Sequence, residues 1–269
     1  MSTITLNPVA IAAGLARHRY LLGQLVRRDV LLRYRGALFG VLWIFLSPLL
    51  MLAIFAFVFG HIFQARWPES REGQPFWLIL YCGLIVFNVF GETVSRASSA
   101  VRSYPAYIKK IIFPVDILPL VPLGAALVHA SFNFLILVAA LAWTGNLSAG
   151  LLLVPLLILP ALLLGIGASW FLAAWGVFIK DMSQIVPLFV QMLLFLSPVF
   201  YPASAVPAEL TFIYQANPLG ATIEAARAAA FGLPVPWAAW LAALAAGLAT
   251  AILGHAFFQH SRDEFADVL

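Results

Sequence analysis

Residues 117–179 read ILPLVPLGAALVHASFNFLILVAALAWTGNLSAGLLLVPLLILPALLLGIGASWFLAAWGVFI, and this stretch contains no Asp, Glu, Lys or Arg. A membrane-spanning helix needs about 20 mostly apolar residues to cross roughly 30 Å of hydrocarbon. The stretch is long enough for two such helices, and the turn-like sequence Thr144-Gly145-Asn146-Leu147-Ser148 lies between them. The chain is therefore predicted to be an all-α integral membrane protein.

The composition of the whole chain agrees with this prediction. Hydrophobic residues make up 63% and charged residues 10% of the sequence, and the mean hydropathy is +0.99. Outside the apolar runs, no segment is long enough to fold a second catalytic domain. Residues 1–269 are expected to form a single membrane domain. The only cysteine, Cys82, rules out an internal disulfide and is expected to be a packing residue.

The apolar runs between charged residues predict six transmembrane helices. The fifth is short for a span and contains Pro187 and Pro198, whose neighbouring backbone groups need partners inside the protein. The predicted spans are residues 38–63, 76–95, 118–143, 151–179, 185–200 and 237–258.

The distribution of basic residues predicts how the spans are oriented. If the first span begins in the cytoplasm, 12 of the 15 Lys and Arg residues lie on that side, and Arg66, Arg71 and Arg227 lie on the other. The positive-inside rule then places both termini of this multi-pass protein in the cytoplasm. The net charge of +4 fits orientation and contact with anionic membrane lipids, and no nucleic-acid partner is expected.

Two cytoplasmic segments have the composition of docking surfaces. Residues 20–35 are expected to form a basic amphipathic helix on the membrane surface, although Asp29 interrupts its apolar side. In the connection 102–118, Pro105 and Pro114 bracket a short helix with aromatic and lysine residues. These residues suit docking of another protein. An ordinary basic flank that sets topology remains open for the first segment, and an aromatic and basic anchor at the lipid headgroups remains open for the second.

Polar residues inside the spans are few. Glu92 lies four residues before Arg96, a spacing that pairs the two charges on one helix face. His129 and Asn133 share a helix face, have no carboxylate spaced beside them, and are expected to hydrogen-bond between helices. No metal site is predicted, because the five histidines lack a second ligand at useful spacing.

The external connection 201–236 is long and weakly charged. The segment 208–214 and the helix beginning at Asn217 are each too short to span the bilayer, so both are candidates for re-entrant helices. The second of these carries Glu224 and Arg227 at i,i+3 spacing.

Short motifs follow one another in a specific order along nearly the whole chain. They are RDVLLRYRG (28–36) followed by LFGVLW (38–43), GLIVFNVF (83–90), Ile108-Lys109-Lys110 with Phe113-Pro114 and Leu118-Pro119-Leu120, and SPVFY (197–201) followed by Asn217-Pro218-Leu219. In this order the chain resembles the membrane subunits of ABC-2 type (type V) exporters that move lipid-linked polysaccharides such as O-antigen, capsule or teichoic acid.

The resemblance implies a homodimer of six-span subunits in the bacterial cytoplasmic (inner) membrane, bound to two copies of a cytoplasmic ABC ATPase. It also implies that the N-terminal interface helix and short coupling helices contact the ATPase. On this sequence the coupling residues are Arg28, Asp29, Arg33, Tyr104, Pro105, Tyr107, Lys109, Lys110, Phe113, Pro114, Lys180 and Asp181.

The chain is not expected to hydrolyse ATP. None of Lys109, Lys110 and Lys180 lies in a Gly-x-x-x-x-Gly-Lys-Ser/Thr phosphate-binding loop. ATP and Mg²⁺ are therefore assigned to the partner ATPase, and no cofactor is assigned to this chain.

The resemblance places the substrate pathway at the dimer centre, chiefly along the first and fifth spans. Aromatic rings there offer flat surfaces to the C–H faces of sugars, although most of the 22 phenylalanines must pack or face lipid. The candidate pathway residues are Trp43, Phe55, Phe59, Tyr81, Phe87, Phe195 and Tyr201.

Three alternatives remain open from the sequence. An ABC-2 exporter can carry a smaller lipid or a drug instead of a polysaccharide. An ion-coupled secondary transporter is expected to have buried carboxylates in interrupted spans, yet the third and fourth spans contain no acid. A membrane-embedded glycosyltransferase needs acidic residues on an external loop, where Glu209 and Glu224 are a poor set.

Overall fold

The computed structural model describes residues 7–68, 74–108, 113–210, 212, 214 and 216–268, which form helices joined by short connections and contain no strand. The α-helices are α1 (Pro8–Arg17), α2 (Arg19–Arg33), α3 (Trp43–Phe55), α4 (Phe76–Ala100), α5 (Pro105–Ile108), α6 (Val121–Trp143), α7 (Val154–Leu157), α8 (Leu159–Phe178), α9 (Met182–Leu196), α11 (Pro218–Ala230), α12 (Trp237–Ser261) and α13 (Phe265–Val268). Shorter segments include η1 (Gly40–Leu42), η2 (Ala56–Ile62), η3 (Val115–Leu120), η4 (Ala149–Leu153), η5 (Ala203–Ala205), η6 (Ala208–Leu210) and η7 (Arg262–Glu264).

Among the described residues, five helical stretches are long and apolar enough to cross a membrane. They are Gly40–Ile62, Phe76–Ala100, Val115–Trp143, Ala149–Phe178 and Trp237–Glu264. These five stretches coincide with five of the predicted spans and confirm an all-helical membrane-type fold. The segment predicted as the fifth span forms α9, which has 15 residues and is shorter than the other five. It ends at Leu196 because Ser197 is already extended and Pro198 follows.

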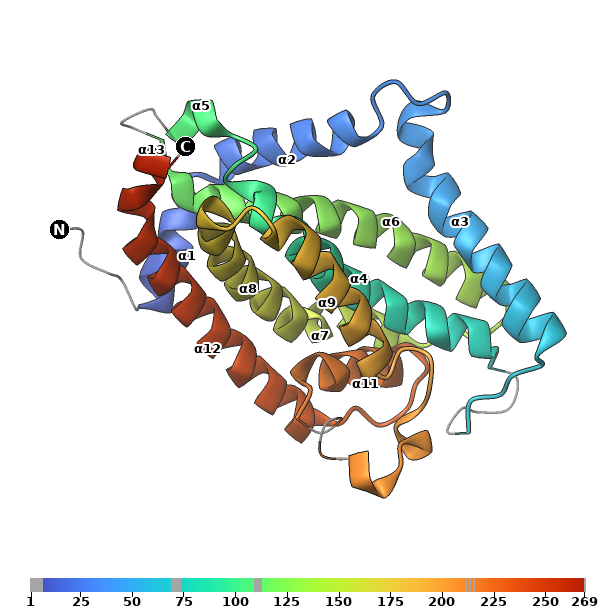
Figure 1. The fold of residues 1–269 in the computed structure, drawn as a ribbon. Coiled ribbons are helices and arrows are strands. Elements are labelled where there is room, and N and C mark those ends of the chain that lie inside the picture. The colour runs from blue at the N-terminus through green and yellow to red at the C-terminus, as the bar shows by residue number, and fades with distance from the viewer. Residues whose placement is uncertain are drawn as a thin grey trace.

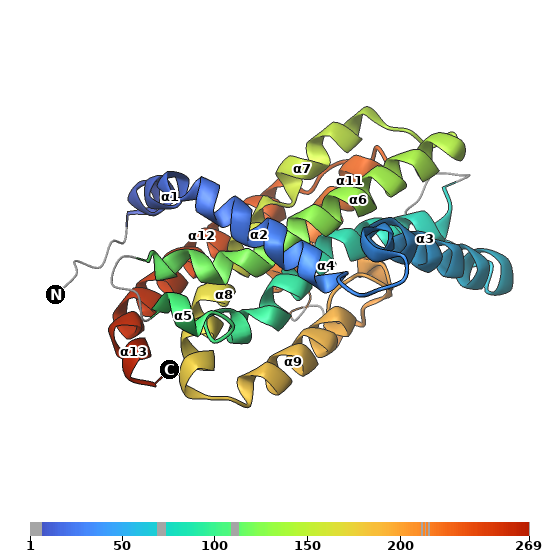
Figure 2. The same cartoon turned by 90° about the horizontal axis from the view of Figure 1, so that it is seen from above.

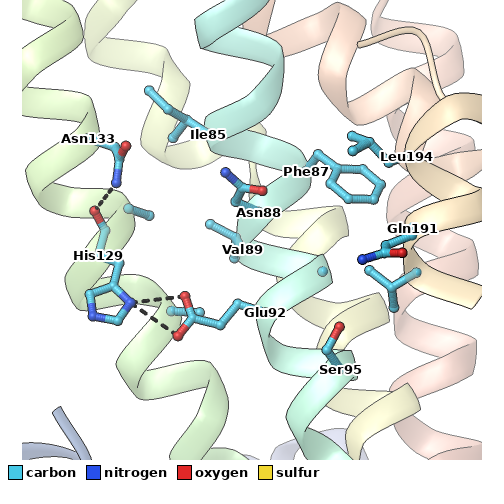
Figure 3. A pocket seen from close by; sticks show the side chains of 14 residues that line it. Ile85, Phe87, Asn88, Val89, Glu92, Ser95, His129, Asn133, Gln191 and Leu194 are labelled. Atoms are coloured by element: carbon cyan, nitrogen blue, oxygen red, sulfur yellow. Dashed lines mark hydrogen bonds and ion pairs between the residues drawn. The ribbon is translucent and has the colours of Figure 1, made fainter. Parts of the chain in front are cut away.

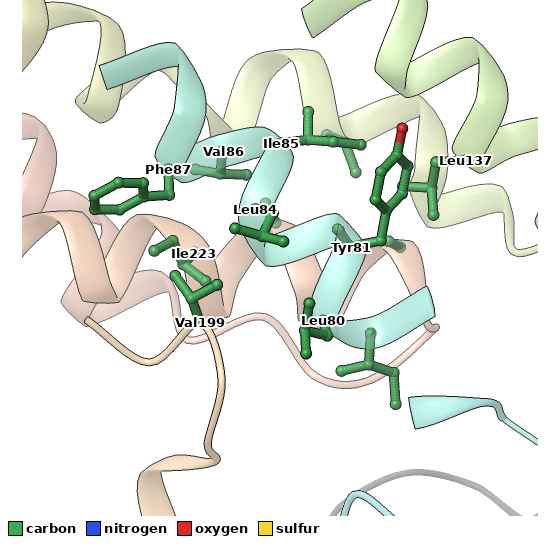
Figure 4. Close-up of a cluster of buried hydrophobic side chains, with 14 of the residues drawn as sticks. Leu80, Tyr81, Leu84, Ile85, Val86, Phe87, Leu137, Val199 and Ile223 are labelled. Atoms are coloured by element: carbon green, nitrogen blue, oxygen red, sulfur yellow. The ribbon is translucent and has the colours of Figure 1, made fainter. Parts of the chain in front are cut away.

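Helix α4 lies at the centre of the bundle and packs against α6, α8, α9 and α11 (Figures 1 and 2). Its side chains Leu78, Leu80 and Val86 are fully buried. Figure 4 shows this core, in which residues of α4 meet Leu137 of α6 and Ile223 of α11. Helix α4 therefore contacts most of the other long helices of the bundle.

Small residues allow α8 and α12 to pack closely. A Cβ atom on Gly167 of α8 would overlap the backbone of Thr250, and one on Gly254 of α12 would overlap the backbone of Gly167. Small residues at helix crossings are how membrane helices bring their backbones together. These glycines fix α12 against α8.

Different elements pack together at the two ends of the bundle. At one end, here called the terminal end, Leu25 of α2, Tyr104, Leu118 of η3, Phe258 of α12 and Phe265 of α13 form one buried cluster. At the other, the α11 end, α11 packs against η4 and α7. Figure 1 shows α2, α5 and α13 gathered at the first end and α11 at the second.

Helix α9 connects these two ends. It follows α8, whose Phe178 ring lies 6.0 Å from the ring of Phe265 at the terminal end. Just beyond its C-terminus, Ser197 accepts a hydrogen bond from Asn217, the N-cap of α11. Helix α9 therefore runs from the terminal end to the α11 end despite its short length.

The predicted interface helix 20–35 is observed as α2, and a helix that was not predicted, α1, precedes it. The chain turns between α2 and the first long apolar helix through Gly36 (φ +85°) and Gly40 (φ +49°), a backbone region that favours glycine. This turn lets α2 lie across the bundle, where it packs against α6 (Figure 2).

The predicted short helices of the external connection are only partly described. The helix beginning after Asn217 is α11, with 13 residues. Of the segment 208–214, η6 covers Ala208–Leu210, while residues 211 and 213 lie outside the described residues.

Candidate coupling network and polar cavity

Two ion pairs join α2 to α4. Nη2 of Arg96 donates to both carboxylate oxygens of Asp29, at 2.7 and 2.8 Å, and Nη2 of Arg33 donates to Oε1 of Glu92 at 2.6 Å. On each helix the acid precedes the base by four residues. The two helices run antiparallel here, so the order of charges on one is opposite to the order on the other. Each acid therefore faces a base on the other helix.

The i,i+4 pair that the sequence indicates on α4 is also present. Nη1 of Arg96 lies 3.7 Å from Oε1 of Glu92, a longer distance than either contact to α2. These four charges have side-chain exposures between 16% and 35%, so water only partly screens them. Breaking a buried ion pair by removing one partner lowers the free energy of unfolding by about 3–5 kcal/mol, and the loss is smaller for pairs that are this exposed.

His129 of α6 extends the network. Its Nδ1 atom lies 3.0 Å from both Nη1 of Arg33 and Oε2 of Glu92, and its Nε2 atom lies 3.1 Å from the Tyr34 hydroxyl. Arg33 can only donate, so Nδ1 either accepts from Arg33 or, when it carries a proton, donates to Glu92. Residue spacing does not indicate a carboxylate beside His129, because Glu92 is 37 residues away along the chain.

A polar cavity of about 340 Å³ begins at this network and continues between α4, α6 and α9 (Figure 3). Its polar lining consists of Asn88, Glu92, Ser95, His129, Asn133 and Gln191. On α4, Tyr81, Asn88, Glu92 and Ser95 share one helix face. Leaving a polar group without a partner in hydrocarbon costs several kcal/mol, so such a face must meet water, protein or ligand.

An adjoining cavity of about 390 Å³ lies between α3, α4 and α6. It shares Ile85, Asn88, His129 and Asn133 with the first cavity and adds residues of the N-terminal segments, among them Arg33, Tyr34, Trp43 and Ser47. The Tyr81 hydroxyl donates to Oδ1 of Asn133 at 2.8 Å, and Nδ2 of Asn133 donates to the His129 carbonyl at 2.7 Å. Hydrogen bonds thus join α4 to α6 along these cavities.

Four of the predicted coupling residues, Arg28, Tyr104, Tyr107 and Phe113, form a chain of contacts at the terminal end. The Tyr104 ring is buried and faces Arg28 of α2, whose Cζ lies 5.1 Å from the ring centre. Burial raises the pKa of Tyr104 above its ordinary value, so its phenol stays neutral at physiological pH. The Tyr104 ring contacts Tyr107, and Tyr107 contacts Phe113. Tyr104 is thus placed to position α2 from within the chain.

The remaining residues of this set are more exposed or lie outside the described part of the chain. Pro105 is exposed, and Pro114 is partly exposed. Lys180 and Asp181 are exposed at the turn between α8 and α9. Lys109 and Lys110 lie outside the described residues.

The predicted pathway aromatics separate into three groups. Trp43, Tyr81 and Phe87 line the two cavities. Phe55 and Phe59 pack against one another and against the core. Phe195 is exposed near the α11 end of α9, where the Tyr201 hydroxyl donates to its carbonyl.

Sequence reasoning missed several cavity residues, chiefly Asn88, Ser95 and Gln191. The signal for α4 was present, because the polar residues Tyr81, Asn88, Glu92 and Ser95 recur at helical spacing in an otherwise apolar span. Gln191 had no such signal, because it is an isolated polar residue between apolar neighbours in α9.

A second buried charge stabilises the α11 end. Arg227 of α11 is 3% exposed and donates to Glu224 at 2.6 Å and to the carbonyls of Pro198 and Val199 at 2.9 and 3.3 Å. Its Nε atom donates to the carbonyl of Ile79 on α4, and its guanidinium lies 4.3 Å from the centre of the Trp67 ring. Arg227 therefore ties the end of α9, α11 and α4 together.

Comparison with known proteins assigns this architecture to a family. The sequence pattern described as ABC-2 type transporter matches residues 20–231. The O-antigen export system permease protein RfbA of Myxococcus xanthus is 28% identical over 264 residues, covering 96% of this chain and 99% of the relative. A protein of the same name from Klebsiella pneumoniae is 23% identical, in an alignment that covers 93% of this chain and 95% of the relative. The polysialic acid transport protein KpsM of Escherichia coli is 24% identical, covering 75% of this chain and 78% of its own. The chain belongs to the ABC-2 type transporter family.

Proposed function

We propose that this chain is the membrane-spanning permease subunit of an ATP-driven exporter of lipid-linked polysaccharide, with O-antigen as the favoured cargo over capsule or teichoic acid. The similarity to O-antigen export permeases over nearly the full length of both chains carries the proposal. A polar cavity inside an otherwise apolar bundle is consistent with transport of a hydrophilic polymer.

The proposed topology has six crossings of the bacterial inner membrane, of which α9 makes the fifth. Both termini lie in the cytoplasm. The course of α9 between the two ends of the bundle supports a crossing by α9, which brings the total from five to six. The placement of α2, α5 and the α8–α9 turn at the terminal end fits the excess of Lys and Arg expected on the cytoplasmic side. Helix α11 and its flanking segments then form an external re-entrant region.

The proposed assembly is a homodimer that binds two ABC ATPase subunits, which supply ATP and Mg²⁺. Apolar side chains of α3 and α9, among them Leu50, Leu188 and Phe189, are uncovered in the single chain. These two helices flank the polar cavities, so a second copy placed against them would enclose the pathway. The remaining apolar surface would face lipid.

In the proposed mechanism the ATPase displaces α2, and α2 moves α4. The Asp29–Arg96 and Arg33–Glu92 pairs connect these helices directly. Nucleotide binding would then favour one of two arrangements of the bundle because the ATPase contacts differ between them. Glu92 lies at the junction between the network and the cavity, so motion of α2 would reach the pathway lining.

Co-purification tests this proposal. The tagged chain is isolated in a mild detergent, its partners are identified by mass spectrometry, and ATP hydrolysis is measured with and without lipid-linked polysaccharide. A stoichiometric ABC ATPase whose activity rises with the glycolipid supports the proposal. A chain that carries no ATPase in several mild detergents contradicts it and favours a secondary transporter or an enzyme, while stimulation by a small lipid or drug alone contradicts the polysaccharide assignment.

A further inference from the structure

We propose that Asn88 and Gln191 form a binding site for an uncharged, hydroxyl-rich glycan segment halfway along the pathway. This inference rests on the proposed export function and specifies the chemical class of its cargo. The site lies between α4 and α9, in the 340 Å³ cavity shown in Figure 3.

The position of Asn88 is unusual for a polar residue. It is the thirteenth of the 25 residues of α4, so about 18 Å of helix separates it from either end. Its neighbours Phe87 and Val89 are buried, whereas Asn88 itself is exposed to the cavity. Gln191 is likewise exposed beside the buried Val190 of α9. Two amides therefore line the same cavity from different helices, at the depth where hydrocarbon would otherwise surround them.

The hydrogen-bonding capacity of these amides is unused within the described part of the chain. No hydrogen bond joins either side chain to another described residue, whereas the Asn133 amide is engaged by Tyr81 and the His129 carbonyl. Each free amide presents one acceptor oxygen and two N–H donors. Sugar hydroxyls both donate and accept, so a glycan satisfies these groups as water does.

The charges of the cavity select against an acidic polymer. Within its described lining, Glu92 and His129 are the ionisable side chains, and they contact each other at the terminal end of the cavity. The carboxylates of Asp29 and Glu92 balance the guanidinium groups of Arg33 and Arg96. A polyanion such as polysialic acid, which has a carboxylate on every sugar, would find no unpaired cation in this lining. A glycan without charge avoids that cost.

Cysteine labelling tests the site in the complex of the chain with its co-purified ATPase, held in lipid nanodiscs. In a Cys82→Ala background, Asn88→Cys and Gln191→Cys are compared with Val86→Cys, which replaces a fully buried side chain of α4 outside the cavity lining. Iodoacetamide is expected to modify the first two at least tenfold faster than the third. Equal rates at all three positions would overturn the assignment of a water-accessible site.

Oligosaccharide protection then tests the class of ligand. Millimolar maltoheptaose, which is uncharged, is expected to slow modification at positions 88 and 191 at least threefold, and an oligogalacturonate of equal length is expected to leave the rate unchanged. Absence of protection by maltoheptaose, or equal protection by the acidic oligomer, would overturn the proposal. ATP hydrolysis stimulated by lipid-linked polysaccharide in the same preparation shows whether the export function stands independently of this site.

Substitution provides a second readout. The double variant Asn88→Leu with Gln191→Leu keeps side-chain size but removes both amides, and is expected to lower export of an uncharged polysaccharide at least fivefold with subunit abundance retained. Ser131→Leu is the control, because Ser131 is also an exposed polar residue of a membrane helix but does not line the cavity. Export by the double variant equal to that of the control would contradict the site.

Discussion

Asp29 on α2 and Arg96 on α4 form an ion pair in which one guanidinium nitrogen donates to both carboxylate oxygens, at 2.7 and 2.8 Å. Four residues further along α2, Arg33 reaches Glu92, four residues before Arg96 on α4. The helix that is proposed to receive the motion of the ATPase is thus fixed at two points to the helix at the centre of the bundle.

A double-mutant cycle of Asp29→Asn and Arg96→Gln is expected to show coupling of about 1–3 kcal/mol in the free energy of unfolding. Arg96→Gln leaves the Asp29 carboxylate partly buried without this partner, and Asp29→Asn leaves Arg96 with only its longer contact to Glu92. Thermal or denaturant unfolding in one detergent measures it. Additive effects of the two changes would show that the pair does not join the helices energetically.

Glu92→Gln is expected to uncouple transport from ATP hydrolysis. The change removes the negative charge that faces Arg33, Arg96 and His129, and so loosens α4 from both α2 and α6. We expect the ATPase to be recovered with the chain while the amount of polysaccharide moved per ATP falls several-fold. Glu264→Gln, which changes an exposed carboxylate of η7, is the control, and an unchanged transport ratio in Glu92→Gln would contradict this role.

The sequence indicates which charged residues take part in this network better than it indicates which residues they contact. Apolar runs locate the long helices, and the i,i+4 spacing on α4 indicates a Glu92–Arg96 contact. The shorter contacts of these residues are made to α2, which is more than 50 residues away, and helical periodicity carries no information about such pairing. For the same reason, His129 was assigned no carboxylate although Glu92 lies beside it.

The polar cavity could be foreseen only in part. The polar stripe on α4 is visible in the sequence, but the facing element is α9, whose Gln191 stands alone among apolar residues. Aromatic residues were selected by type, and packing then divides them, since Tyr81 lines a cavity whereas Phe59 lines neither cavity and packs against the core. Helix α1 was missed although Asn7, its N-cap, and Pro8, at its first position, are helix-start signals in the sequence.

Arg227→Lys is expected to destabilise the protein by about 3 kcal/mol or more, because an ammonium cannot replace the several N–H donors that reach Glu224 and the backbone carbonyls. The melting temperature in detergent measures the effect. Arg66→Lys, at an exposed arginine next to Trp67 in the chain, provides the comparison. Equal melting temperatures for the two variants would refute the proposed structural role of Arg227.

Gly167→Ala is expected to reduce the amount of folded protein strongly, since the added methyl group would overlap the backbone of α12. Gly165→Ala is a matched control two residues away on the same helix, where the nearest neighbour of the added carbon is a Thr93 methyl group at 3.6 Å. Size-exclusion chromatography of the membrane extracts compares the two variants. Similar recovery of both would show that α8 and α12 tolerate a wider separation.

Tyr104→Ala combined with Phe113→Ala is expected to reduce recovery of the ATPase while membrane insertion is retained. The rings pack beneath α2 and in the adjacent α5 segment, so their removal loosens the proposed docking surface. Tyr104→Phe keeps the ring that faces Arg28 and is expected to retain most of the complex. Undiminished ATPase recovery with the double alanine variant would contradict the assignment of this segment.

Transport in proteoliposomes tests the central claim most directly. Vesicles containing this chain and its co-purified ATPase, with lipid-linked polysaccharide on the ATPase side, are supplied with ATP, and arrival of the glycan on the opposite side is followed with a glycan-binding probe. The account predicts ATP-dependent transfer that is lost when the chain is omitted and lowered per ATP by Glu92→Gln. Hydrolysis of ATP without any transfer of the glycan, or transfer that proceeds equally without ATP, would contradict it.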